Sequence, residues 1–202
     1  NNKDKIILDL CGGTGAWSRP YKEAGYDVEI ATLPDFDVRY WHHSWLSDLV
    51  FESGKIYGIL AAPPCTMFSL ARTRAKTPRD FNEGMECVRA CLDIIWVNRE
   101  YNKLKFWALE NPMGYLRQFL GKPPFTFNPY DFGDSYTKKT DLWGYFNEPK
   151  KKLIKLSAEE LARCKINNRK LPSISDITGS KQSDRRAITP AGFAKAFFEA
   201  NK

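Results

Sequence analysis

The stretch that decides the fold is Lys5-Ile6-Ile7-Leu8-Asp9-Leu10-Cys11, followed at once by Gly12-Gly13-Thr14-Gly15. A short apolar run that ends at glycines is typical of a buried parallel strand followed by a tight turn. Residues 16–24 then predict a helix with Gly25 at its end, and residues 26–32 predict a second strand. This order of strand, glycine turn, helix and strand forms one βαβ unit.

The rest of the chain continues the alternation of strands and helices. Further strands are predicted over residues 56–62, 105–109 and 142–146. Helices are predicted over 81–98, where Met85, Val88, Leu92 and Ile95 recur at helical spacing, from Ser157 onward, and over 191–200 with Pro190 at the first position. Residues 163–186 are polar and predict a loop. The alternation predicts an α/β fold with a mainly parallel sheet and helices on both faces.

Length and composition indicate one globular domain over residues 1–202. Hydrophobic residues make up 43% and charged residues 27%, which is ordinary for such a domain. We expect neither a membrane span nor a secretory signal, because no sufficiently long apolar run is present. Five cysteines without a close-spaced framework favour a reducing, cytoplasmic compartment, and the single histidine pair His42-His43 argues against a metal site.

The net charge of +7 and the pI of about 9.1 favour a polyanionic partner, of which nucleic acid is the commonest. A basic surface that binds nothing remains the alternative. Many of the cations lie in the second half of the chain, at Lys138, Lys139, Lys150, Lys151, Lys152, Arg163, Lys165, Arg169, Lys170, Lys181, Arg185 and Arg186.

Ligands of open α/β sheets bind at the carboxyl ends of the strands, and three strand ends here carry reactive residue types. At the first, glycines allow close backbone approach and Asp9 can accept a hydrogen bond; a plain tight turn is the alternative. At the second, Pro63-Pro64 hold Cys65 on rigid backbone, which suits a nucleophile, although a structural cysteine is the alternative. At the third, Glu110 ends an apolar strand and is either a proton donor with a raised pKa or a surface glutamate.

The order of D-x-x-x-G-x-G, P-P-C-x-x-F-S and E-N over residues 5–146 resembles the cytosine carbon-5 DNA methyltransferase family, in particular small phage-encoded members. The resemblance implies a Rossmann-like methyltransferase fold that binds S-adenosylmethionine and releases S-adenosylhomocysteine. It implies Cys65 as the nucleophile toward carbon 6 of a flipped cytosine, with Glu110 holding the ring. The residues implied for the cofactor are Asp9, Cys11, Gly12, Gly13, Thr14, Gly15, Asp37 and Pro63, and those implied for the DNA substrate are Pro64, Asn111, Lys138 and Lys139.

The sequence also departs from the family pattern. Cys11 stands where the family has Phe, which leaves Trp17 as a candidate aromatic contact, and Pro112 follows Asn111 where the family has Val. The Q-x-R-x-R motif is absent; residues 132–140 occupy its place, so that Lys138 or Lys139 is the candidate substitute. No large target-recognition domain is present, and only residues 147–186 remain to read DNA beyond the flipped base.

Three functions therefore stay open. The first is a monomeric DNA cytosine-5 methyltransferase of a bacterial or phage-infected cell. The second is a methyltransferase-fold protein that binds nucleic acid without catalysis, favoured by the missing motif and domain. The third is a cytosine methyltransferase that acts on single strands or free nucleotides, favoured by the small size.

Overall fold

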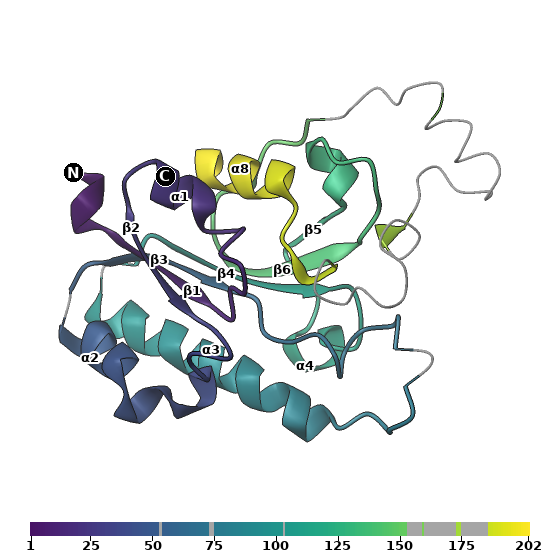
Figure 1. Ribbon diagram of the computed structural model, residues 1–202, viewed down its shortest axis with the longest axis horizontal. Coiled ribbons are helices and arrows are strands. Elements are labelled where there is room, and N and C mark those ends of the chain that lie inside the picture. The colour runs from purple at the N-terminus through teal and green to yellow at the C-terminus, as the bar shows by residue number, and fades with distance from the viewer. Residues whose placement is uncertain (53, 73–74, 103, 153–158, 160–172, 175–185) are drawn as a thin grey trace.

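The chain forms a six-stranded sheet in the order β2-β1-β3-β4-β6-β5, seen in a computed structural model (Figure 1). The structure describes residues 1–52, 54–72, 75–102, 104–152, 159, 173–174 and 186–202. The strands are β1 (Ile6–Leu10), β2 (Asp27–Ala31), β3 (Ile56–Ala61), β4 (Phe106–Pro112), β5 (Phe125–Phe127) and β6 (Thr140–Tyr145). The first four strands are parallel, whereas β6 and β5 are antiparallel to their neighbours. The predicted α/β class and mainly parallel sheet are confirmed.

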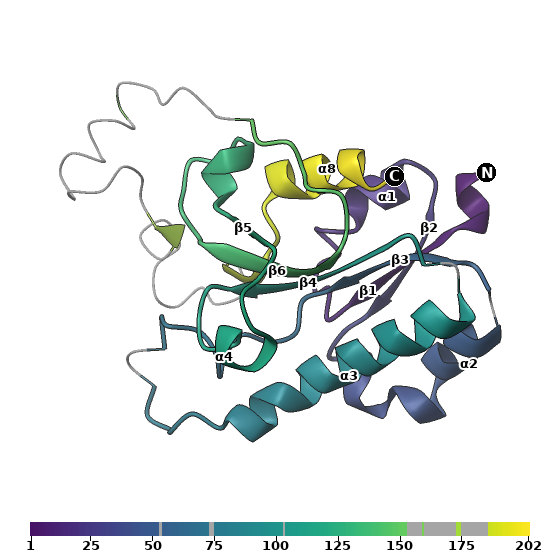
Figure 2. The same ribbon diagram turned by 180° about the vertical axis from the view of Figure 1, so that it is seen from behind.

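Helices cover both faces of this sheet, as Figures 1 and 2 show. One layer contains α2 (Trp45–Glu52), α3 (Phe81–Tyr101) and α4 (Arg117–Leu120), and the other contains α1 (Arg19–Glu23) and α8 (Ala191–Ala200). Short 3-10 helices precede β1, at η1 (Asn2–Asp4), and lie in the connections, at η2 (Val38–His43), which is kinked at Tyr40, and η3 (Pro129–Phe132). The arrangement is the three-layer architecture of Rossmann-like folds.

The two faces of β1 explain why a continuous apolar run was needed. Leu8 and Leu10 belong to the core cluster on the α2–α3 side, whereas Ile7 belongs to the cluster that contains Tyr21 and Phe193. Successive side chains of a strand point to opposite faces, so both core layers take apolar residues from β1, and Asp9 near its carboxyl end is the exception.

Several element boundaries differ from the sequence prediction, among them the end of α3 at Tyr101 and the start of β6 at Thr140. The helix predicted over residues 16–24 is helical only from Arg19, because residues 14–18 form turns. The strand predicted to stop before Glu110 continues to Pro112, because β6 pairs with β4 along its whole length. Pro190 is the N-cap of α8 rather than its first helical residue. The helix predicted from Ser157 and most of the predicted loop at 163–186 lie outside the described residues.

Apolar contacts fix α8, the last helix of the chain, against the sheet. The ring of Phe193 stacks on Phe127 of β5 with centroids 3.9 Å apart, and Phe197 packs against Phe106 of β4. Burial of each such ring stabilises the fold by roughly 1.5–3 kcal/mol. Among the described residues, no helix is long and apolar enough to cross a membrane.

Candidate functional site

The parallel pairing of β1, β3 and β4 brings the three predicted strand ends to one edge of the sheet. Leu10 of β1 is in register with Ala61 of β3, which in turn is in register with Leu109 of β4. The turn after β1, the Pro-Pro-Cys segment after β3 and the end of β4 therefore leave the sheet side by side, at the edge where such folds bind ligands.

Asp9 is a fully buried carboxylic acid beneath the turn after β1. The Ser18 hydroxyl donates a hydrogen bond of 2.6 Å to Oδ2 of Asp9, whereas Oδ1 is buried and has no hydrogen-bond partner among the described residues. Burial raises the pKa of Asp9 from 3.8 to about 6, although the hydrogen bond from Ser18 acts in the opposite direction. Oδ1 is therefore an acceptor that a ligand at this turn can satisfy.

The glycines of the turn are required by its geometry. A Cβ on Gly12 would lie 2.4 Å from the carboxyl carbon of Asp9, which excludes any side chain there. Gly13 and Gly15 have φ of 55° and 66°, a region that L side chains rarely adopt. The Gly13 N–H donates to the Thr32 hydroxyl at 3.1 Å, which ties the turn to the end of β2, and Thr14 between the glycines is exposed.

Two predicted cofactor residues have neighbours that sequence reasoning did not anticipate. Cys11 has φ of 57°, and its thiol packs against Cys91 of α3. The carboxylate of Asp37 accepts hydrogen bonds of 3.0 and 2.6 Å from Nε and Nη2 of Arg39, and these bonds hold its pKa below the ordinary value. Arg39 also reaches Glu86 of α3 at 2.9 Å.

Trp17 is 1% exposed and packs against Phe193 and Phe197 of α8, with ring centroids 5.8 and 5.5 Å away. The Trp17 ring is therefore part of the core between α1 and α8, and the structure gives it no role as an aromatic contact at the turn after β1.

Cys65 lies half-buried after Pro63, which is buried, and Pro64, which is exposed. Its carbonyl oxygen accepts hydrogen bonds from the N–H groups of Phe68 and Ser69, at 2.9 and 2.8 Å, which closes a turn directly after the cysteine. Burial raises the pKa of the Cys65 thiol, and the negative charge of Glu110 raises it further, whereas Lys138 and Arg186 lower it. Cys65 and Glu110, predicted from separate strand ends, thus lie close enough to interact electrostatically.

Glu110 and Lys138 form a largely buried pair beside this cysteine. Nζ of Lys138 lies 3.7 Å from Oε1 of Glu110, and the two side chains are 11% and 14% exposed. Burial raises the pKa of Glu110, while the charge and hydrogen bond of Lys138 lower it. Lys139 is exposed, so Lys138 is the lysine of the predicted pair that meets Glu110.

Asn111, predicted to contact substrate, is fully buried and acts on the cysteine segment. Its Nδ2 donates to the carbonyl oxygen of Pro63 at 3.0 Å, whereas its Oδ1 has no partner among the described residues. This bond joins the end of β4 to the segment that carries Cys65.

Sequence reasoning missed two residues that hold the site, Ser18 and Arg79. Ser18 supports Asp9 from the start of α1, and Arg79 binds backbone carbonyls beyond Cys65. The only sequence signal for Ser18 is its place before Arg19-Pro20, which is typical of a helix start. Arg79 gives no local signal, because its partners lie ten and twelve residues away.

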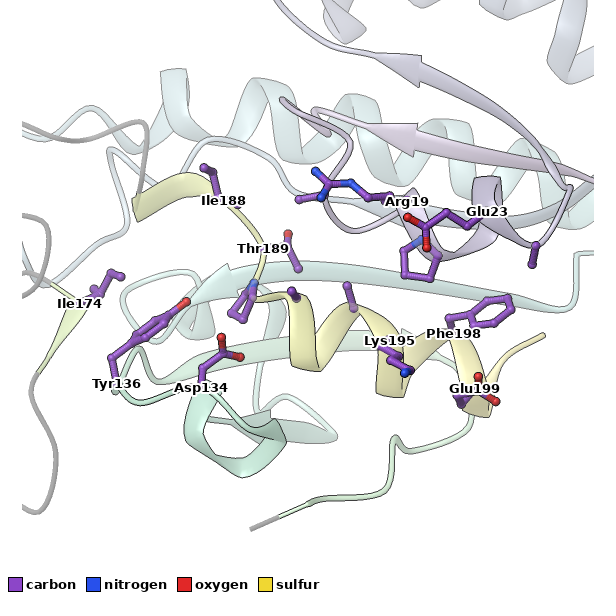
Figure 3. Close-up of a pocket in the computed structure, with 16 residues that line it drawn as sticks. Arg19, Glu23, Asp134, Tyr136, Ile174, Ile188, Thr189, Lys195, Phe198 and Glu199 are labelled. Atoms are coloured by element: carbon purple, nitrogen blue, oxygen red, sulfur yellow. The ribbon is translucent and has the colours of Figure 1, made fainter. Parts of the chain in front are cut away.

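A separate pocket of about 900 Å³ lies between α1 and α8 (Figure 3). Arg19 and Glu23 of α1 and Lys195 of α8 line it, and Asp134 and Tyr136 point into it from the segment before β6. Neither Cys65 nor Glu110 lines this pocket, so it is distinct from the cysteine site. In the part of the chain that the structure describes, no group of three or more potential ligands is arranged to hold a metal ion.

Comparisons with known proteins found a structural likeness only. No family model matches the sequence, and no curated protein matches it. Among solved structures, a crystal structure of a mutant of DNMT2 from Spodoptera frugiperda is similar, with a TM-score of 0.44 and 15% sequence identity over 98% of this chain and 84% of that chain. Similarity at this level carries no information on activity.

Proposed function

We propose that the chain is a DNA cytosine-5 methyltransferase that uses S-adenosylmethionine and in which Cys65 is the nucleophile. The observation that carries the proposal is the Glu110–Lys138 pair within electrostatic range of Cys65, at the sheet edge that also carries the turn after Asp9. A thiol, a carboxylic acid with a raised pKa and a cation are the groups that a covalent attack on an aromatic ring requires.

The residues present fit the cofactor that this reaction needs. Among the described residues, Oδ1 of Asp9 is a buried acceptor without a partner, and the space where a Cβ on Gly13 would lie is open, with nothing within 4 Å. The cofactor site would consist of Asp9 and the Cys11–Gly15 turn, with Asp37 and Pro63 at its margins. When bound there, S-adenosylmethionine supplies an electrophilic methyl group.

The chain's own residues would act on a flipped cytosine as follows. The Cys65 thiolate adds to carbon 6. Glu110, in its protonated form, donates a hydrogen bond to the ring nitrogen at position 3 and so stabilises the negative charge that the addition places on the ring. Carbon 5 then carries the electron density that accepts the methyl group. A base removes the proton from carbon 5, the electron pair returns to the ring, and the Cys65 thiolate leaves.

The electrostatics of the site favour the protonated Glu110, whereas burial raises the pKa of Cys65, so the attacking thiolate depends on the nearby charge of Lys138. Attack requires a thiolate beside a protonated Glu110, so the pair carries one negative charge, which Lys138 at 3.7 Å balances. Burial favours the protonated carboxylic acid, because it raises the pKa of Glu110. Lys138 thus takes the place of the missing arginine motif as a single charge, although without the two-pronged geometry of an arginine.

A methyl-transfer assay with radiolabelled cofactor tests the proposal on duplex DNA, single-stranded DNA and cytosine nucleotides. Preferential labelling of duplex supports the proposal, and labelling of single strands or nucleotides alone favours the substrate alternative. DNA binding without any labelling favours the non-catalytic alternative. Cys65→Ala is the control, since it removes the nucleophile and leaves the cofactor turn intact.

A further inference from the structure

The turn that follows Cys65 is fixed by its own backbone hydrogen bonds. Both Phe68 and Ser69 donate to the carbonyl oxygen of Cys65, at 2.9 and 2.8 Å. The backbone of Cys65 therefore moves with residues 67–69, and any group that holds these residues also holds the thiol.

Arg79 binds this turn from the segment just before α3. Its Nη1 donates to the carbonyl oxygen of Met67 at 2.9 Å, and its Nη2 donates to that of Ser69 at 2.8 Å. One half-buried guanidinium thus spans two carbonyls on either side of Phe68. Asp80, the next residue, caps α3 by accepting from the N–H groups of Asn82 and Glu83, so Arg79 is held at a fixed helix end.

The carbonyl between these two is held from the other side, by the chain that follows β4. The N–H of Tyr115 donates to the carbonyl oxygen of Phe68 at 2.9 Å. The Tyr115 ring also lies under the Arg79 guanidinium, with 4.9 Å between Cζ and the ring centroid. A Cβ on Gly114 would come within 2.3 Å of the same Phe68 oxygen, so the close approach depends on a glycine there. Three successive carbonyls after Cys65 are therefore all bound from outside the turn.

We infer that Arg79 is a positioning residue, which holds the Cys65 turn against the strand end that carries Glu110. The effect of Arg79 on methyl transfer rests on the proposed function, whereas the hydrogen bonds of Arg79 to the turn do not depend on it. Covalent attack needs the sulfur within a few tenths of an ångström of its required place, and a displacement of ~1 Å can cost ~10²-fold in rate. Lysine keeps the charge, but a single ammonium cannot span the carbonyls of Met67 and Ser69 in the manner of a planar guanidinium.

The test compares Arg79→Lys with the wild type and with Arg72→Lys as the matched control. Among the described residues, the Arg72 guanidinium bonds to the carbonyl and hydroxyl of Thr77, within its own loop. Two rates are measured: alkylation of individual cysteines by iodoacetamide, resolved by mass spectrometry, and single-turnover methyl transfer at saturating cofactor. Cys91, which is fully buried, reports on opening of the whole fold.

For Arg79→Lys we expect Cys65 to be alkylated several-fold faster, because its turn is loosened, while Cys91 stays at the wild-type rate. Methyl transfer should fall about tenfold or more with an unchanged cofactor dissociation constant. Arg72→Lys should match the wild type in both rates. Faster alkylation of Cys65 together with slower methyl transfer indicates a positioning role for Arg79, since a merely less stable protein would expose both Cys65 and Cys91.

The inference would be overturned if Cys65 of Arg79→Lys were alkylated at the wild-type rate, or if the alkylation of Cys91 accelerated equally. Faster alkylation of Cys65 with an undiminished rate of methyl transfer would also overturn it. If the wild-type protein transfers no methyl group to any substrate, the proposed function fails instead. The alkylation rates of Cys65 and Cys91 still decide, in that case, whether Arg79 holds the turn.

Discussion

Replacing Asp9 with asparagine should stabilise the protein at neutral pH and weaken its binding of S-adenosylmethionine. Asp9 is fully buried and receives one hydrogen bond, from Ser18, while Oδ1 has no partner among the described residues. An asparagine has nearly the same shape, can accept from Ser18 through its amide oxygen and carries no charge. The buried charge is therefore the main quantity that the substitution removes.

The magnitude follows from the pKa of Asp9, which burial raises from 3.8 to about 6. Between these values the folded state binds more protons than the unfolded state, so stability falls as pH rises through this window. The ionised form costs on the order of 3 kcal/mol above pH 6, and the cost vanishes below pH 3.8. Asp9→Asn should therefore gain about 2–3 kcal/mol at pH 8 and little near pH 4.

Urea unfolding of the wild type and of Asp9→Asn from pH 4 to pH 8 measures this gain, with Asp4→Asn, an exposed carboxylate, as the control. Calorimetry should show cofactor binding weaker by about 10–100-fold, because a hydrogen bond to a charged acceptor is lost. A stability difference that does not change with pH, or an Asp9→Asn protein that is less stable at pH 8, would show that the buried charge of Asp9 does not destabilise the fold.

Three further outcomes follow from the site and the surface charge. Glu110→Gln should reduce methyl transfer about 10²–10⁴-fold, the usual cost of losing a general acid, and an unchanged rate would make Glu110 structural. The same variant should lower the pKa of Cys65 in alkylation pH profiles, because a nearby negative charge is removed. Lys138→Met should raise the pKa of Cys65 in the same profiles, because a positive charge is removed, whereas the exposed Lys122→Met should not, and a lowered pKa would contradict the pairing. DNA affinity should fall steeply with salt, since each phosphate contact releases roughly one counterion, and a flat salt titration would contradict this expectation. Bisulfite sequencing should show a recognised site of about two to four base pairs, and a long, strictly defined site would contradict that.

The sequence was sufficient to predict the framework that places the site. Apart from Asp9, the run Ile6–Leu10 is apolar, as is nearly all of the segment 56–62, a pattern that is typical of strands buried on both faces. Glycines and prolines mark the strand ends by local conformational rules, so Gly12 and Pro63 were located without tertiary information. Because parallel strands share their carboxyl edge, the sequence placed Cys65 and Glu110 at one edge of the sheet, although the order of the strands was known only from the structure.

The supporting contacts could not be predicted, because they join segments that are distant in sequence. The bond from Arg79 to Met67, the bond from Asn111 to Pro63 and the pairing of β5 with β6 depend on the completed fold rather than on a local pattern. The choice of Lys138 over Lys139 is of the same kind. Adjacent residues in extended chain point in opposite directions, and only the position of β4 decides which of the two meets Glu110.

Covalent trapping shows directly whether Cys65 is the nucleophile. Duplex DNA in which cytosine carries fluorine at carbon 5 cannot release the final proton, so the adduct with the attacking residue should accumulate in the presence of S-adenosylmethionine. We expect a shifted protein–DNA band on a denaturing gel for the wild type, a peptide cross-linked at Cys65 by mass spectrometry, and no band for Cys65→Ala. A band that persists in Cys65→Ala, or no band from a wild-type protein that methylates unfluorinated DNA, would contradict this expectation.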